Sequence, residues 1–246
     1  MTGAFETEDD AREGPRRHYV REGMNFSGFP REGVAWFDAL ALSQSREWFQ
    51  AHRAAYESLW LEPMKALLDE LRAPVAKIYG KKISPGKIFR INRDVRFSKD
   101  KRPYKTNIAA VLKFEDSPAM EGPAALYLHL GAEEFVGFGF YRLEPPSLKK
   151  LRGKLLDEKE GPRLQALFDA AKKVGFQSDA LEKLKRPPPG VAKDHPRVEL
   201  LKNKSLALGR DDIPKSVRYS AGLKDWLVEQ TAVAAPIVKW GIKEKL

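Results

Sequence analysis

The sequence predicts an α+β protein in which helices at both ends of the chain flank a central, mostly antiparallel sheet. Apolar residues recur at helical spacing through residues 31–75, alternate at strand spacing through residues 107–143, and return to helical spacing after residue 147. With 246 residues, of which 42% are hydrophobic, the chain is long enough to bury a core. We therefore expect a single α+β domain over residues 25–246. Residues 1–24 are polar and mixed in charge, which predicts a disordered N-terminal extension.

The first part of the domain is predicted to be helical. Residues 31–42 suit a short helix, and Ser43 or Ser45 can cap the next one. From Arg46 onward the aromatic residues follow helical spacing, and an apolar stripe continues to about Val75. Pro63 is expected to kink this helix or to start another.

The middle of the chain changes to strand spacing. Residues 88–97 are β-rich, residues 107–114 alternate, and residues 124–130 and 135–143 read as a hairpin across residues 131–134. Gly137 and Gly139 share one strand face, which leaves a shallow trough for a bulky side chain or a ligand. A closely packed neighbouring helix is the simplest occupant of that trough.

Helical patterns dominate the last third of the chain. Helices are predicted over residues 148–156 and 163–174, followed by a proline-rich loop over residues 185–196. Residues 199–208 combine a helical turn with a short strand. A final helix covers residues 220–240 and is expected to be interrupted or bent at Pro236.

Most of the net charge of +10 comes from one short segment. Residues 81–105 contain ten Lys or Arg and two Asp, and the cations alternate with Ile, Val, Phe and Tyr. The remainder of the chain is nearly balanced in charge. A folded concentration of Arg and Lys is typical of a site for phosphate or another polyanion.

Several functional classes are disfavoured by the composition. Without cysteine, thiolate catalysis and Cys-ligated metals are excluded, and the composition favours a cytoplasmic location. No apolar run is long enough for a membrane span, so no membrane partner is expected. The four histidines have no metal-binding spacing and a Walker-type phosphate loop is absent, so we expect no metal site, and no cofactor is identified.

The candidate site lies in the basic segment. Arginine suits bidentate contact with phosphate, and a lysine- and serine-containing turn at residues 98–105 can cradle one. Strand alternation would send Phe89 and Phe97 to the core and leave Tyr104 as the exposed aromatic residue. Neighbouring cations should lower the pKa of Asp94 and Asp100, which favours a bracing role. The candidate ligand-binding residues are Arg90, Arg93, Arg96, Lys101, Tyr104 and Lys105, and the candidates for proton transfer are Asp94 and His129.

The string RINRDVRFSKDKRPYK at residues 90–105 resembles the signature of a widespread family of unknown function, domain-of-unknown-function family 2461. Three further segments resemble the same family: Arg46-Glu47-Trp48-Phe49, Tyr127-Leu128-His129 with Gly137-Phe138-Gly139, and the late block from Leu184 to Lys204. Ser43-Gln44-Ser45 departs from the asparagine pair expected before the first of these. The resemblance implies the fold and supplies no activity.

The basic segment leaves three functions open. The leading hypothesis is a local pocket for a phosphate-bearing small molecule or nucleotide, with or without an enzymatic step. The first alternative is a nucleic-acid-binding module without catalysis, and the second is an arginine network that braces the fold and binds nothing. Because the cations are concentrated in one short segment, a local pocket ranks above an extended basic stripe. The oligomeric state is left open.

Overall fold

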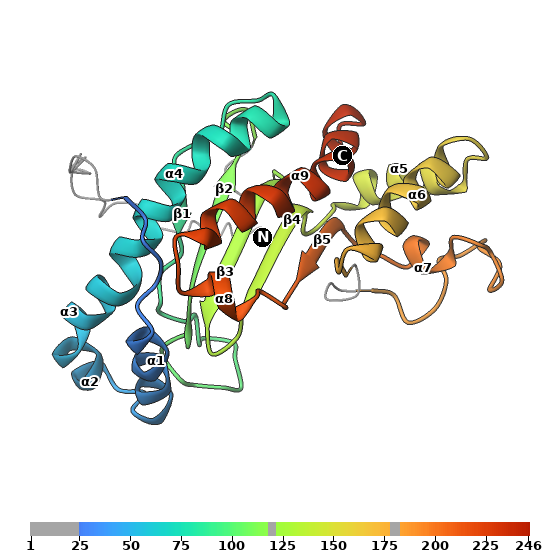
Figure 1. Ribbon diagram of the computed structural model, residues 1–246. Coiled ribbons are helices and arrows are strands. Elements are labelled where there is room, and N and C mark those ends of the chain that lie inside the picture. Colours follow the sequence, from blue (N-terminus) through green and yellow to red (C-terminus); the bar gives the residue numbers. More distant parts are fainter. Residues whose placement is uncertain (1–24, 118–121, 178–182) are drawn as a thin grey trace, which may run out of the picture.

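The computed structural model describes residues 25–117, 122–177 and 183–246. Its helices surround a central β-sheet (Figure 1). The strands are β1 (Lys87–Ile88), β2 (Asn107–Lys113), β3 (Ala124–Gly131), β4 (Phe135–Phe140) and β5 (Leu206–Arg210). Their spatial order is β1-β2-β3-β4-β5, and every neighbouring pair is antiparallel. The α+β prediction is confirmed. The predicted extension at residues 1–24 lies outside the described residues.

Helices precede and follow the strands of the sheet. The N-terminal group comprises α1 (Glu32–Leu42), α2 (Arg46–Ala51), α3 (Arg53–Tyr56), the π-helical turn η1 (Glu57–Leu61) and α4 (Glu62–Tyr79). The later group comprises α5 (Pro145–Leu156), α6 (Glu160–Lys173), α7 (Val198–Leu201), α8 (Lys215–Arg218) and α9 (Gly222–Lys243). In Figure 1, α4 and α9 lie across one face of the sheet, whereas α5, α6 and α7 lie beyond its β5 edge.

Alternation along the strands separates two faces of the sheet. Ile108, Ala110 and Leu112 of β2 point into the core that α4 and α9 cover, as the spacing predicted, and Leu126 and Leu128 of β3 join them. The residues between them, such as Val111, Tyr127 and His129, point to the opposite face, where Tyr127 and His129 are half-buried. We call this opposite side the open face. It is the floor of one of the two cavities described below.

The predictions at two prolines have different outcomes. Pro63 starts a helix, which was one of its two expected roles, since it is the second residue of α4 and follows the π turn η1. Proline is well tolerated in the first turn of a helix, where its missing N–H has no partner to lose. The final helix α9 is not interrupted, since it continues through Pro236 to Lys243.

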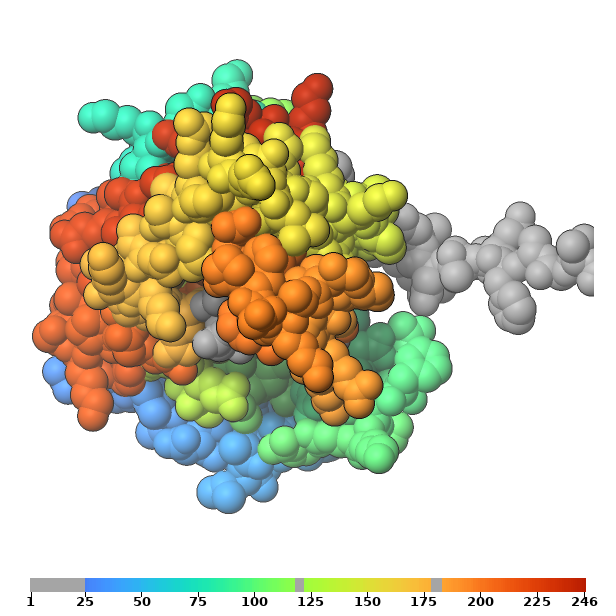
Figure 2. Space-filling view, turned by 90° about the vertical axis from the view of Figure 1, so that its right-hand side faces the viewer, coloured from blue at the N-terminus to red at the C-terminus, as the bar shows by residue number. Residues whose placement is uncertain are grey.

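The strand predicted over residues 88–97 is also wrong in most of its length. β1 ends at Ile88, and the chain then leaves the sheet until β2 begins at Asn107. An isolated bridge between Asn92 and Tyr104 holds the two sides of this excursion together. We call residues 93–102, at its tip, the basic loop. In Figure 2 the green segment that includes it and the orange segment around α7 stand forward on either side of a recess.

Candidate functional site

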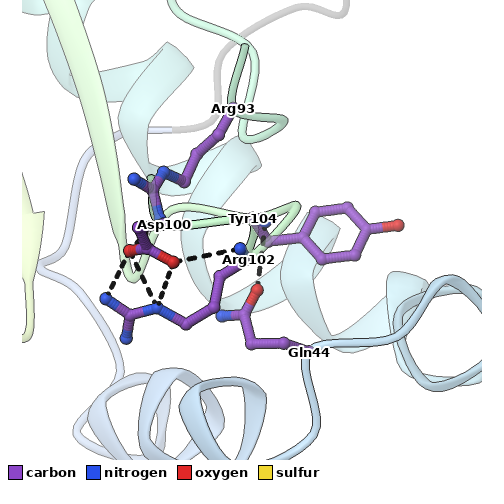
Figure 3. Close-up of polar contacts among 5 residues, drawn as sticks. All are labelled: Gln44, Arg93, Asp100, Arg102 and Tyr104. Atoms are coloured by element: carbon purple, nitrogen blue, oxygen red, sulfur yellow. Dashed lines mark hydrogen bonds and ion pairs between the residues drawn. The ribbon is translucent and has the colours of Figure 1, made fainter. Parts of the chain in front are cut away.

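The basic loop is braced by its own aspartates. Asp100 accepts hydrogen bonds from Arg93 at 2.5 Å and from Arg102 at 2.7 Å (Figure 3). Asp94 binds Arg96 in the same way, with the shortest N–O distance at 2.8 Å. Three arginines of the loop are therefore matched to carboxylates only two or seven residues away.

These contacts set the protonation of the two aspartates. Hydrogen bonds from the Arg96 side chain and backbone lower the pKa of Asp94 to about 2. Hydrogen bonds from Arg102 and then Arg93 hold the pKa of Asp100 well below its usual range. The predicted direction is confirmed for both residues. A carboxylate this strongly held in its charged form suits a brace better than a general acid.

The tip of the basic loop presents an aromatic residue to solvent. Phe97 is 96% exposed, and the guanidinium carbon of Arg96 lies 5.9 Å from its ring centroid. The ammonium of Lys101 donates to the Val95 carbonyl at 2.9 Å. The prediction that Phe89 and Phe97 point into the core is wrong. Phe97 lies in the loop, where strand alternation does not apply, and Phe89 lies on the open face, with its ring centroid 6.2 Å from that of Tyr127. Phe89 is half-buried and lies outside the core cluster.

Tyr104 lies in the interior. Its side chain is 5% exposed and stacks on Phe49 of α2, with ring centroids 4.6 Å apart. Its backbone N–H donates to Oε1 of Gln44 at 3.0 Å (Figure 3). The prediction of an exposed Tyr104 is therefore wrong, because α2 covers this stretch of the chain. The turn that departs from the family pattern has two structural roles, since Ser45 beside Gln44 caps α2.

A groove of about 660 Å³ opens between α2–η1 and the chain that follows β1. We call it the arginine groove. Its polar lining consists of Arg46, Gln50, Arg53, Tyr56, Glu57, Arg90, Asn92 and Tyr104. It therefore joins two segments that lie far apart in the sequence, the first helices and the start of the basic signature.

The arginine groove has an excess of positive charge. The Arg53 Nε lies 2.9 Å from Oε1 of Glu57, so that carboxylate is already occupied. The side chains of Arg46 and Arg90 make no hydrogen bond or ion pair with any residue in the described ranges, and Arg90 contributes only a minor charge effect on Asp94. Burial raises the pKa of Tyr56 to about 12, so its hydroxyl is a neutral hydrogen-bonding group. Unpaired arginines in a concave site attract anions.

A second cavity of about 550 Å³ lies on the open face, and we call it the open-face pocket. Its floor includes Gly137 of β4, and the ring of Phe135 lies over that glycine and over Gly209 of β5. A bulky side chain, Phe135, therefore fills the trough at Gly137, as one of the expected occupants, and the expectation of a packed helix there is wrong. A strand side chain that folds back over its own sheet has no sequence pattern of its own.

The open-face pocket also contains the two polar rings of β3. The Tyr127 hydroxyl lies 3.2 Å from Nδ1 of His129, and the His129 ring stacks against Phe135. Burial lowers the pKa of His129 below its usual value of 6.5, and the nearby Glu133 opposes this only in part. His129 is therefore a neutral imidazole at pH 7, able to accept or donate a proton.

The predicted site residues thus fall into separate places. Arg90 and Tyr104 line the arginine groove, and His129 lines the open-face pocket. Lys105 lines neither cavity, and its ammonium lies 5.9 Å from the ring centroid of Phe89. The remaining predicted residues, Arg93, Asp94, Arg96 and Lys101, belong to the basic loop and bind one another or its backbone.

Sequence reasoning missed the helical half of the arginine groove. Arg46, Gln50 and Arg53 all line it, and their spacing of four and then three residues places them on one helical face. That spacing was visible in the sequence.

No group of three His, Asp or Glu residues suited to a metal ion is found among the described residues. The same part of the chain contains no helix that is long and apolar enough to cross a membrane.

Comparison with known proteins adds a family and no activity. A family model described as a conserved hypothetical protein, DUF2461, matches residues 32–240. This match confirms the resemblance based on the signature at residues 90–105. No curated protein matches the chain.

Proposed function

Because the chain belongs to the DUF2461 family, whose description names no activity, we propose a function from the site itself: the arginine groove binds a small phosphate-bearing molecule. One observation carries the proposal. Arg46 and Arg90, from segments 44 positions apart, line the same groove, and neither is paired with a described residue. Two guanidiniums that line one concavity without a carboxylate partner favour the binding of an anion there.

The composition of the groove fits phosphate. Arg presents several N–H donors in a planar fork, and Gln50, Asn92 and the neutral Tyr56 hydroxyl add further hydrogen-bonding groups. A volume of about 660 Å³ is in the range of sites for metabolites and nucleotides. The groove therefore replaces the basic loop as the centre of the site, with Arg90 and Tyr104 as the predicted residues that belong to it.

The loop arginines support a different role. Arg93, Arg96 and Arg102 are matched to Asp94 and Asp100, which is what the structural-network alternative expects of them. We infer that they shape the loop and contribute a positive field near the groove without contacting the ligand. Asp94 is then a bracing residue, and His129 is the group still available for proton transfer.

Titration with inorganic phosphate and pyrophosphate tests the proposal. The protein should show saturable thermal stabilisation, and Trp48 of α2 should report binding by fluorescence. Arg46→Gln and Arg90→Gln should each weaken binding by roughly tenfold or more, since a charge-assisted contact is worth about 1.5–3 kcal/mol. Arg186→Gln is the matched control, because Arg186 is exposed and lies outside the groove. Equal weakening in all three variants, or no stabilisation of the wild type, would reject the proposal.

One observation favours a nucleic-acid module as the second candidate. Phe97 is 96% exposed on a cationic loop, with Arg96 against its ring, and such a pair suits stacking on an unpaired base. A short single-stranded oligonucleotide would then bind with a steep salt dependence and weaken on Phe97→Ser. Binding that is insensitive to Phe97→Ser would remove this candidate.

A further inference from the structure

The arginine groove and the open-face pocket share a rim. Phe89 lines both cavities. The Lys105 ammonium lies 5.9 Å from the Phe89 ring centroid, and the charge of Arg90 helps to lower the pKa of Lys105, after burial as the larger cause. Arg90 and Lys105 therefore place positive charge beside Phe89. The groove lies on the helix-covered side of β1 and the pocket on the open face, so a ligand that occupied both cavities would pass Phe89 at the edge of the sheet.

The open-face pocket has the chemistry of a site for a flat ring. Phe89 and Tyr127 have ring centroids 6.2 Å apart, and Tyr127 and Phe135 have centroids 6.3 Å apart. No carboxylate belongs to its described lining, in which Lys113 is the charged residue. Apolar and aromatic walls with a few polar groups are typical of small-molecule sites. The pocket thus suits an uncharged aromatic ring. Because its described lining has no carboxylate to repel an anion, that ring can carry a phosphate group.

We propose that the ligand of this protein is an aromatic ring joined to a phosphate, of the size of a mononucleotide, with its phosphate in the arginine groove and its ring in the open-face pocket. This inference rests on the proposed function, because it assigns the phosphate to Arg46 and Arg90. The shared rim formed by Phe89 is the observation that connects the two cavities.

His129, oriented by Tyr127, would hydrogen-bond to the edge of the ligand's ring. When the Tyr127 hydroxyl donates to Nδ1 of His129, the neutral imidazole carries its proton on Nε2. That N–H can donate to a ring nitrogen or carbonyl oxygen. Burial favours this neutral form of His129, as its lowered pKa indicates.

Binding of AMP and of ribose 5-phosphate distinguishes the ring from the phosphate. The two probes differ by the base, and base stacking on aromatic side chains should make AMP bind about tenfold more tightly. Ala124→Leu should abolish this difference, because Ala124 lines the open-face pocket and is only partly buried, so a larger side chain there reduces the room for the base. Ala170→Leu, on the exposed side of α6, is the matched control.

A measurement on the wild type keeps the test independent of the variant's folding. The His129 ring resonances should shift with AMP and remain unchanged with ribose 5-phosphate. If both probes bind equally and Ala124→Leu changes neither affinity, the ring inference is overturned while phosphate binding in the groove stands. If AMP binds but Arg90→Gln has no effect, both the joint ligand and the proposed function are wrong. Loss of the AMP advantage in Ala124→Leu together with loss of both affinities in Arg90→Gln supports the inference.

Discussion

The contact between Phe135 and Gly209 allows a quantitative test of the open face. A Cβ added at Gly209 would lie 2.1 Å from Cζ of Phe135 and 2.4 Å from Cε2, which is far inside van der Waals contact. The ring must therefore leave its place over β5 when Gly209 is replaced by alanine. Because Phe135 is half-buried on an accessible face, it can move without distorting the core.

The expected magnitudes follow from the burial of the ring. Phe135→Ala should cost about 2 kcal/mol of unfolding free energy, about half the usual value for a buried phenylalanine. Gly209→Ala loses about 1.5 kcal/mol of ring contacts and gains about 0.5 kcal/mol from the reduced freedom of the unfolded chain, a net loss of about 1 kcal/mol. With Phe135 already removed, the alanine meets no ring, and Gly209→Ala should instead stabilise by about 0.5 kcal/mol.

Urea unfolding of the four proteins in this double-mutant cycle measures the coupling directly. We expect an interaction of about 1.5 kcal/mol between the two sites, with the sign of the Gly209→Ala effect reversed in the Phe135→Ala background. Circular dichroism at 222 nm follows the transition, and unchanged m-values show that all four proteins unfold alike. If Gly209→Ala destabilises both backgrounds equally, Phe135 does not occupy the trough and the description of the open-face floor is wrong.

Three further predictions concern the braced loop, the histidine and the packing of α2. Asp100→Asn should speed trypsin cleavage at Lys99, Lys101 and Arg102 without moving the urea midpoint, because Asp100 braces only the basic loop; an unchanged cleavage rate would contradict the brace. His129 should titrate below pH 6.5 when followed by NMR. Because its folded-state pKa is lowered, the unfolded chain binds more protons than the folded protein as the pH falls below 6.5. Stability should therefore decline with acidification through that window, and His129→Gln should remove this part of the decline. Phe49→Ala should lower the unfolding free energy by about 3 kcal/mol, since Phe49 is buried against Tyr104; a loss below about 1 kcal/mol would show that the stack is not part of the core.

Periodic segments of the sequence were predictable, and the excursion after β1 was not. The alternation at residues 107–114 identified β2 and its buried face because one side of the strand packs on helices. Residues 89–106 contain similar residue types, yet Asp94 and Asp100 bind nearby arginines and hold the chain in a loop. Local ion pairs of this kind leave no periodic signal. Burial of Tyr104 was equally hidden, since it depends on Phe49 and Gln44, which lie far away in the sequence.

The candidate site was half visible in the sequence. The basic signature identified Arg90, but the phosphate hypothesis placed too much weight on arginines that the loop uses for itself. Arg46, Gln50 and Arg53 share a helical face, and only the packing of α2–η1 against the chain after β1 makes that face one side of a groove. Which cations remain unpaired is a property of tertiary structure.

The position of β5 has a consequence for the order in which the chain folds. β2, β3 and β4 follow one another along the chain and pair as a meander, whereas β5 pairs with β4 across an intervening stretch that includes α5, α6 and α7. Closing that long loop costs more chain entropy than forming the hairpins, so we expect β5 and α9 to dock after the meander. Pulse-labelled hydrogen exchange during refolding should then protect Leu128 and Gly137, whose amides face strands of the meander, before Leu208, and simultaneous protection would show instead that the sheet assembles in a single step.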